Sequence, residues 1–532
     1  MNKRKLKIIA VTVAVVTALL FLGVFGLADS IKDGMFNMNT PMHITPNTTV
    51  TGKIESKDDY EAYMFEVEKD GALDVRLDHD NLLDSVKCGY KVTLYKIIEG
   101  REREYREITY FNSFWSDVTS GWGETGVSAG TYVVTVEPGA DIIFGEFTLV
   151  TTFTATTTYE KELNDTKEEA NPISVGRAAY GSSSQRSEGY DYDWFVFELS
   201  ADSCVNLSFV HEDLTYPMAG WNIKIITEKD EVVCDFTSKL TDTVIKTGSL
   251  GLRAGTYYII IENVSPVATT YSMVLGADKA VNHEFELNDT PETAINLPQN
   301  IPMGGSLADR LLSLDKDYYK INVTENGVLE ATFSHEALEG NKNGWNIRIL
   351  KKEENGEYLE IVRKISAWNS KTCVISNLGL AAGEYYILID GDSLSYNSAS
   401  YTIQWSLTPR EDFETEPNGT PESARDITGN KKYYGAIISN DTEFDEDYYK
   451  FVITEERNVS LELGHEKVNN SSLTWITSIL DENGNEVRTV ESPLNEGLVN
   501  TGVITLTEGT YYIKVETGMY GSEIPYYLNL VW

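Results

Sequence analysis

The sequence predicts an all-β chain: four tandem β-sandwich domains of jelly-roll type, preceded by an N-terminal signal or anchor helix. Three observations predict this fold class. Apolar and polar residues alternate along short segments, turns rich in Gly, Asn and Asp separate these segments, and one order of segments recurs four times. After the N-terminal stretch we find no long amphipathic helical pattern.

The N-terminal segment comes first in this order. Four basic residues precede an uncharged apolar run over residues 8–28, and small residues stand just before Asp29. This pattern is typical of a secretory signal peptide, although the run is also long enough for an uncleaved membrane anchor. Both interpretations predict a secreted or cell-surface protein that contacts a membrane only through this segment.

The repeats follow, each about 125–130 residues long, which is the size of a domain. Every repeat has an alternating strand that ends in histidine and a later strand that begins Gly-Thr-Tyr or Gly-Glu-Tyr. We expect a signal peptide or anchor at 1–28, a divergent first repeat at 29–155, and further repeats at 156–281, 282–410 and 411–532.

The repeated histidines lie on the apolar side of their strands, ten or eleven residues before an aromatic residue. We expect each to pack against that aromatic residue at the edge of the core, with its imidazole hydrogen-bonded to the backbone. None belongs to an HExxH zinc motif. The histidines are His79, His211, His335 and His465, and their aromatic partners are Tyr90, Trp221, Trp345 and Trp475.

The four cysteines are too few for a disulfide scaffold in a chain of 532 residues. Cys204 and Cys234 fall in the same repeat and are able to pair. Cys88 and Cys373 have no partner within their repeats, so we expect them to be buried thiols.

The net charge of −38 argues against nucleic acid as a partner and suits divalent cations, although an acidic surface also simply keeps a secreted protein soluble. The sequence contains no G-x-S-x-G elbow, Walker A loop or HExxH motif. We therefore expect a protein that is not an enzyme.

An acidic element of the form Glu-x-Glu-x-Asn-[Asp/Gly]-Thr precedes repeats two, three and four, and an Asp-x-Asp pair follows 25–30 residues later. Ca²⁺ takes six to eight oxygen ligands from carboxylates, amides and backbone carbonyls, which matches this inventory. The candidate ligands are Glu160, Glu162, Asn164, Asp165, Asp191 and Asp193 in repeat two; Glu284, Glu286, Asn288, Asp289, Asp315 and Asp317 in repeat three; and Glu414, Glu416, Asn418, Asp445 and Asp447 in repeat four.

Several arrangements of this acidic element remain open. Alternate residues of an extended chain lie about 6.6 Å apart, so one ion with fewer ligands and two adjacent ions fit equally well. An Asx-turn with solvated acids and an Asn-x-Thr glycosylation site are the alternatives without a metal.

Together with the Asp-x-Asp-aromatic and Ala-Gly-Thr-Tyr-Tyr motifs, this element resembles the bacterial pre-peptidase C-terminal domain family. That family includes the collagen-binding domains of secreted bacterial collagenases. The resemblance covers repeats two to four, and it implies jelly-roll sandwiches that bind calcium through the matching residues. Repeat one lacks the element, so we expect no site there, and Gly419 in place of Asp predicts a weaker site in repeat four.

Strand alternation places Tyr258, Tyr386 and Tyr512 on the outer face of the Gly-[Thr/Glu]-Tyr strand. Exposed tyrosines suit contact with collagen-like polypeptides or sugars, and the resemblance implies this use; tyrosines covered by a neighbouring strand are the alternative. The sequence therefore predicts a calcium-stabilised extracellular binding or adhesion protein that recognises protein or glycan. A passive stalk or spacer and an accessory subunit of a secreted peptidase are the alternative functions.

Overall fold

The computed structural model describes residues 41–100, 103–214, 218–265, 269–311, 314–391, 397–438, 445–517 and 523–532. The expected signal or anchor segment, 1–28, lies outside these residues. Within them the regular secondary structure consists of strands and one short 3₁₀ helix, which confirms the predicted all-β class. No helix in this part of the chain is both long and apolar enough to cross a bilayer.

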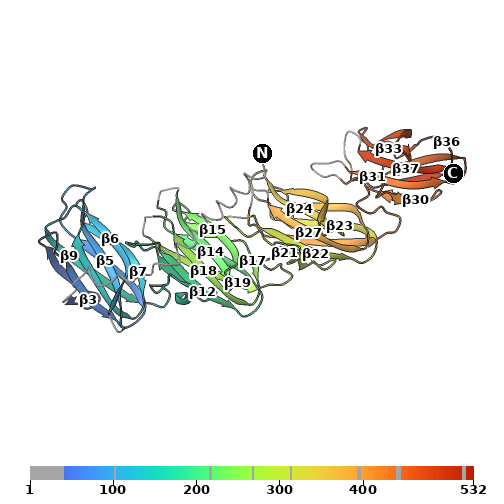
Figure 1. Cartoon of the computed structure of the whole chain (residues 1–532). Coiled ribbons are helices and arrows are strands. Elements are labelled where there is room, and N and C mark those ends of the chain that lie inside the picture. The colour runs from blue at the N-terminus through green and yellow to red at the C-terminus, as the bar shows by residue number, and fades with distance from the viewer. Residues whose placement is uncertain are drawn as a thin grey trace, which may run out of the picture. The chain divides into compact units, whose positions relative to one another are not determined.

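Eight sheets form four β-sandwiches along the chain (Figure 1). Sandwich 1 contains β1 (Met42–His43), β2 (Thr49–Ile54), β3 (Glu61–Val67), β4 (Gly71–Asp78), β5 (Cys88–Ile98), β6 (Glu104–Phe114), β7 (Thr119–Val127), β8 (Gly130–Pro138) and β9 (Gly145–Ala155). Sandwich 2 contains the short 3₁₀ helix η1 (Lys167–Glu169) and β10 (Asn171–Pro172), β11 (Ala178–Ser182), β12 (Tyr192–Leu199), β13 (Ser203–His211), β14 (Ala219–Thr227), β15 (Val232–Lys239), β16 (Val244–Lys246), β17 (Leu250–Leu252), β18 (Gly255–Asn263) and β19 (Thr270–Lys279).

The remaining strands form two further sandwiches of the same kind. Sandwich 3 contains β20 (Ile295–Asn296), β21 (Met303–Gly305), β22 (Lys316–Val323), β23 (Gly327–His335), β24 (Asn343–Lys352), β25 (Tyr358–Ala367), β26 (Thr372–Leu380), β27 (Gly383–Gly391) and β28 (Tyr401–Pro409). Sandwich 4 contains β29 (Arg425–Asp426), β30 (Lys432–Gly435), β31 (Glu446–Ile453), β32 (Arg457–His465), β33 (Leu473–Asp481), β34 (Glu486–Pro493), β35 (Leu498–Asn500), β36 (Ile504–Leu506), β37 (Gly509–Thr517) and β38 (Tyr526–Val531).

One strand order recurs in the last three sandwiches. In sandwich 3, one sheet runs β20-β22-β27-β24-β25 and the other β21-β28-β23-β26. The short first strand β20 pairs parallel with β22, and the other strands of the sheet pair antiparallel. Sandwiches 2 and 4 repeat this order, with β17 and β36 as short additional partners of β13 and β32. The repeated sequence pattern therefore corresponds to a repeated topology.

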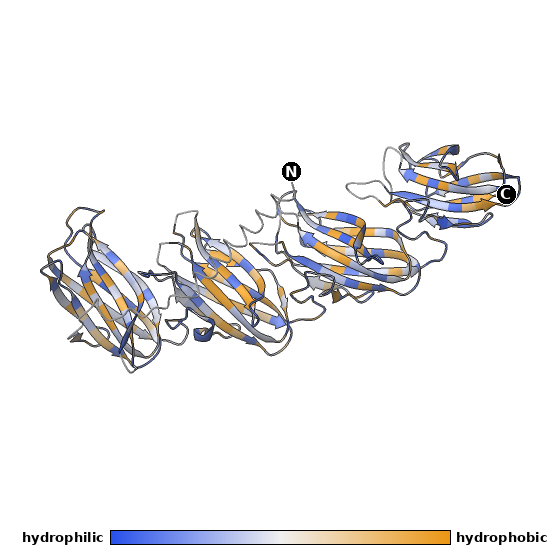
Figure 2. Ribbon diagram, in the orientation of Figure 1, coloured by the Kyte–Doolittle hydropathy of each residue, from blue (hydrophilic) through white to orange (hydrophobic). Residues whose placement is uncertain are grey.

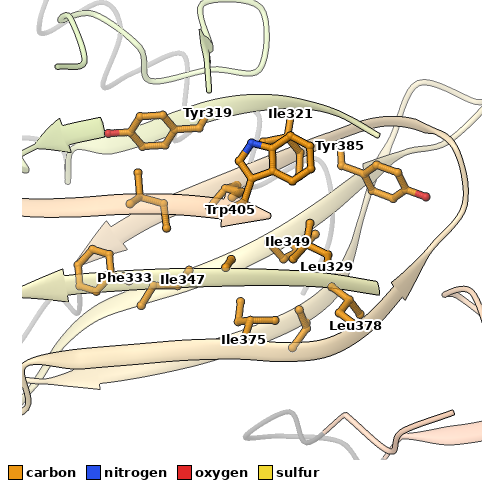
Figure 3. Close-up of a cluster of buried hydrophobic side chains, with 14 of the residues drawn as sticks. Tyr319, Ile321, Leu329, Phe333, Ile347, Ile349, Ile375, Leu378, Tyr385 and Trp405 are labelled. Carbon is orange, nitrogen blue, oxygen red and sulfur yellow. The ribbon is translucent and has the colours of Figure 1, made fainter. Parts of the chain in front are cut away.

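The core of each sandwich lies between its two sheets, because alternate side chains of every strand point inward. Hydrophobic and hydrophilic residues alternate along the strands in Figure 2. In sandwich 3, Tyr319 and Ile321 of β22 meet Phe333 of the opposite sheet (Figure 3). Asp317 has the same parity as Tyr319 and is fully buried. The alternation that builds the core thus also carries an acidic side chain into it.

The histidines behave as predicted. The rings of His211, His335 and His465 lie 4.3, 4.0 and 4.2 Å from their tryptophan partners, and each Nδ1 contacts the backbone oxygen of the following glutamate. Nε2 has a partner that the sequence analysis missed, a serine on the neighbouring sheet. These serines are Ser238, Ser366 and Ser492, at 2.9–3.0 Å. Both ring nitrogens are satisfied, so the histidines are part of the core.

The cysteines depart from expectation. All four are free thiols, and Cys204 and Cys234 lie on different sheets of sandwich 2, in β13 and β15. The possible disulfide between them is therefore not formed. Cys234 is the buried thiol, whereas Cys88 and Cys373, expected to be buried, are only partly covered because they lie at strand ends.

Candidate metal centre

Three carboxylates meet at one end of the core in each of sandwiches 2, 3 and 4. One oxygen from each member of a group lies within 4.8 Å of the others. Each group combines the two glutamates of the acidic element with the second aspartate of the Asp-x-Asp pair. The groups are Glu160, Glu162 and Asp193; Glu284, Glu286 and Asp317; and Glu414, Glu416 and Asp447.

The segment that carries the glutamates forms backbone hydrogen bonds with two successive sandwiches. Glu284 N donates to Gly304 O at 3.0 Å within sandwich 3, whereas Glu286 N donates to Gly251 O of β17, in sandwich 2, at 2.9 Å. In sandwich 4, Glu416 N reaches Gly379 O of β26 at 2.9 Å in the same way. Residue 251 must be glycine because a Cβ there would lie 1.9 Å from Glu284 O.

An asparagine follows each glutamate pair and is buried. The peptide bond after the second glutamate is cis in all three segments. Asn288 Nδ2 donates to Glu284 Oε2 at 2.9 Å, and Asn418 Nδ2 donates to Glu414 Oε2 at 3.1 Å. The Oδ1 atoms of Asn164, Asn288 and Asn418 accept no hydrogen bond. A buried acceptor without a partner costs about 1–3 kcal/mol, and these three oxygens, each beside an acidic group, could serve as further ligands of a metal ion.

A tyrosine hydroxyl donates a hydrogen bond to the aspartate of each group. Tyr271 donates to Asp193 Oδ2 at 2.6 Å, Tyr401 to Asp317 Oδ2 at 2.5 Å, and Tyr526 to Asp447 Oδ2 at 2.5 Å. The other aspartate oxygen, Oδ1, accepts no hydrogen bond in any of the three sites. The sequence analysis missed these tyrosines, although a tyrosine near the start of the last strand of each repeat was a usable signal.

Burial dominates the electrostatics of the carboxylates. It raises the pKa of Glu160 to about 8 and that of Glu414 to about 7, while the pKa values of Glu284 and Asp447 rise well above the ordinary range. Repulsion between neighbouring carboxylates adds to each shift, for example from Asp317 on Glu284. Burial and repulsion both disfavour the anionic forms, and a bound cation would reverse this.

The structure divides the predicted ligands of sandwiches 2 and 3 into two groups. Arg186 Nη1 lies 2.6 Å from Asp165 Oδ2, and its Nη2 lies 2.7 Å from Asp191 Oδ1 and 3.2 Å from Glu162 Oε2. Asp165 and Asp191 are thus bound to an arginine and lie outside the three-carboxylate group.

Sandwich 3 repeats this arrangement around Arg310, which the sequence analysis also missed. Its guanidinium lies 2.8 Å from Asp289 Oδ1, 3.0 Å from Asp315 Oδ1 and 3.1 Å from Glu286 Oε2. The first aspartate of the Asp-x-Asp pair has a further role, because Asp191, Asp315 and Asp445 each accept a backbone N–H from seven residues upstream. An arginine five residues before Asp191 and Asp315 was the available signal.

The outward tyrosines differ from one another. Tyr386 is only 4% exposed, because Tyr358 of β25 packs edge-on against it at 5.4 Å between ring centroids. The prediction of an exposed tyrosine is therefore wrong at this position. Tyr258 is half-buried beside Trp194 and beneath Lys167 Nζ, and Tyr512 is half-buried as well.

Comparisons with known proteins give limited information about these sandwiches. The sequence matches no protein-family model and no curated protein. The pre-peptidase C-terminal domain of collagenase from Bacillus anthracis is a similar solved structure, with 20% identity over 21% of this chain and 99% of that chain and a TM-score of 0.18.

Two other solved structures show weaker sequence similarity. The CBM22-1-CBM22-2 tandem domain of Xyn10C from Paenibacillus barcinonensis is 10% identical over 40% of this chain and 82% of that chain, with a TM-score of 0.15. The CUB1-EGF-CUB2 domains of rat MASP-1 are 9% identical over 44% of this chain and 100% of that chain, with a TM-score of 0.14. Similarity at this level assigns no function. The fold and the acidic groups define a tandem β-sandwich protein with three candidate metal centres.

Proposed function

We propose that this chain is an extracellular, non-catalytic binding protein whose second, third and fourth sandwiches each bind Ca²⁺. The observation that carries the proposal is the threefold recurrence of three clustered carboxylates beside a buried asparagine oxygen that accepts no hydrogen bond. In sandwich 3 the ligands would be Glu284, Glu286, Asn288 and Asp317, with the matching residues in sandwiches 2 and 4. The motif resemblance to pre-peptidase C-terminal domains supports the same assignment.

The chemistry of the donors favours calcium over other metals. Each group offers only carboxylate and amide oxygens, which suit hard cations, whereas zinc and copper prefer histidine or cysteine. The clustered oxygens come from two side chains of the acidic segment and one of a nearby strand, and Ca²⁺ tolerates such irregular sets. When bound, the ion supplies the positive charge that these buried carboxylates lack.

Metal binding would also affect the joint between successive sandwiches. The segment that carries the glutamates donates one backbone hydrogen bond to its own sandwich and one to a strand of the sandwich before it, as Glu414 and Glu416 do with Tyr434 and Gly379. Fixing the glutamate side chains therefore fixes the backbone that spans the joint. We propose that calcium stiffens these joints.

The partner of such a chain would be an extracellular polypeptide or glycan surface. A passive spacer is the second candidate function, and the burial of Tyr386 favours it because this burial removes one of the three expected contact residues. Binding of the chain to immobilised collagen, other matrix proteins and cell-wall glycans, with Ca²⁺ or with EGTA, distinguishes the two. Calcium-dependent retention supports a binding protein, and uniform failure to bind supports a spacer.

Calcium binding itself is tested by calorimetric titration and thermal melting of the whole described chain. At a hundredfold excess over Kd, each site should stabilise its sandwich by about 2.7 kcal/mol. The triple variant Asp193→Asn, Asp317→Asn and Asp447→Asn should lose both the binding heat and the shift in Tm. A matched control replaces three exposed acids instead, Glu228→Gln, Glu330→Gln and Glu496→Gln. Equal calcium responses in the two triple variants would contradict the proposal.

A further inference from the structure

An aspartate–arginine ion pair lies beside two of the three candidate metal centres, and the third occurrence of the acidic element, in repeat four, carries neither residue. Asp165 accompanies Arg186 in sandwich 2, and Asp289 accompanies Arg310 in sandwich 3. In repeat four, Gly419 stands where the aspartate would be. The position that corresponds to the arginine, two residues after the backbone donor Ile438, is Asn440, which lies outside the described residues. The fourth repeat thus carries neither member of this ion pair.

The arginine joins two parts of its site without any metal. Arg186 connects Glu162 and Asp165, on the acidic segment, to Asp191, which precedes β12. Its side chain is 10% exposed, and that of Arg310 is 9% exposed. A guanidinium presents several donors in a rigid plane, and ion pairs shielded from water are screened little by salt. Each arginine therefore ties the acidic segment to the body of its own sandwich.

Sandwich 4 has no arginine ion-paired to its acidic group among the residues that the structure describes; Arg425 donates only to the backbone oxygens of Glu411 and Phe413. Glu414, Glu416, Asp445 and Asp447 form no ion pair with a described lysine or arginine. Burial raises the pKa of Glu416 well above its usual range, and the charge of Lys351 offsets only part of this rise. Glu416 is 8% exposed, and its Oε1 accepts no hydrogen bond. The same is true of Oδ1 of Asn418 and Asp447. Oxygens without a hydrogen bond also occur at the other two sites, so the feature that sets the fourth site apart is the lack of an arginine among its described residues.

We infer that Arg186 and Arg310 act as built-in counter-ions, which hold the acidic segments of sandwiches 2 and 3 in place when calcium is absent. The fourth segment keeps its hydrogen bonds to Tyr434 and Gly379 but has no arginine counter-ion among the described residues, so its carboxylates rely on the bound cation. The inference rests on the proposed calcium binding and adds an order to it: calcium removal releases the segment before sandwich 4 first. The three sites then differ in their dependence on the metal, although they share the three-carboxylate group.

Hydrogen–deuterium exchange of the intact chain, followed peptide by peptide in Ca²⁺ and in EGTA, tests this order. The informative amides are those of Glu162, Glu286 and Glu416, whose acceptors lie on strands β7, β17 and β26 of the sandwich that precedes each in sequence. In EGTA we expect the Glu416 amide to exchange at least about tenfold faster than in Ca²⁺, with a smaller change at the other two. If EGTA accelerates all three equally, the inference is overturned while calcium binding stands. If EGTA changes none, the proposed function itself fails.

A variant of sandwich 2 provides the second test. The double variant Asp165→Gly, Arg186→Asn gives this site the residues that repeat four carries at the two positions. Its acidic segment should then respond to EGTA as the fourth segment does. The control is Arg177→Asn, which removes an exposed arginine of the same sandwich. An EGTA response in the double variant no larger than in the control would overturn the inference. If the double variant fails to fold even in Ca²⁺, the comparison of the three wild-type segments still decides.

Discussion

Tyr271 and Asp193 lie 78 residues apart in the sequence and face each other across the core of sandwich 2, with the tyrosine hydroxyl 2.6 Å from the carboxylate. The same contact joins Tyr401 to Asp317 and Tyr526 to Asp447. Each hydroxyl contacts one oxygen of its aspartate, and the other aspartate oxygen accepts no hydrogen bond. Tyr271 and Tyr526 also lie 3.2 Å from Glu160 Oε2 and Glu414 Oε2. A tyrosine on one sheet thereby orients a candidate metal ligand on the other.

Tyr271→Phe should weaken calcium binding in sandwich 2 while leaving the fold intact. Loss of a hydrogen bond that orients a ligand typically lowers metal affinity by about 10–100-fold. Calorimetric titration of the whole chain should show one class of sites weakened and the others unchanged. Tyr257→Phe is the control, because its hydroxyl binds the backbone of Arg253, away from the carboxylates. Identical titrations for the two variants would argue against an orienting role.

Glu284→Gln should remove the calcium response of sandwich 3. The substitution keeps the shape of the side chain but removes one of three clustered charges, and the neutral amide is a weaker ligand. We expect the Ca²⁺-induced increase in Tm to decrease by the share of one site. Glu292→Gln, on the exposed surface of the same sandwich, should melt as the unaltered chain does. A full increase in Tm for Glu284→Gln would mean that this carboxylate does not bind the ion.

Gly251→Ala should disturb the joint that precedes sandwich 3. A Cβ at this position would lie 1.9 Å from Glu284 O, so the acidic segment must move. Forcing extra volume into a packed site costs about 1–3 kcal/mol. Denaturant unfolding should show this loss, and exchange of the Glu286 amide should accelerate. Gly255→Ala, where the nearest atom lies at 3.8 Å, should behave as the unaltered chain; an equal effect of the two substitutions would contradict the close approach.

Ser366→Ala should destabilise sandwich 3 without altering calcium binding. It removes the partner of His335 Nε2, at 2.9 Å, and leaves a buried ring nitrogen unsatisfied. The expected loss is about 1–3 kcal/mol in free energy of unfolding. Calcium stoichiometry should stay the same, because His335 contacts Trp345 and backbone and lies outside the carboxylate group. A changed stoichiometry would show that the histidine contributes to metal binding.

Sequence alternation was sufficient for the parts of the molecule that depend on strand parity. It placed His335 beside Trp345, and the recurrence of the acidic element identified the glutamates and Asp317 as neighbours. It did not identify Tyr401, whose contact with Asp317 arises only when the two sheets close on each other. It also missed Arg310, because the loop before β22 must fold back onto the acidic segment to bring this arginine to Glu286 and Asp289. It also failed at Tyr386, where parity correctly indicated the outer face but Tyr358 of the adjacent strand covers it.

Through the hydrogen bond from Glu286 to Gly251, the acidic segment of the third centre pairs with a strand of the preceding sandwich. A fragment that starts at the repeat boundary before Glu284 keeps every carboxylate of the third centre but loses the strand against which the segment rests. The boundaries of the sequence repeats therefore do not coincide with the boundaries of the structural units that hold each acidic segment. The acidic segment should be held more loosely in an isolated repeat than in the same repeat with the preceding sandwich attached. Each centre is therefore assembled by two successive sandwiches.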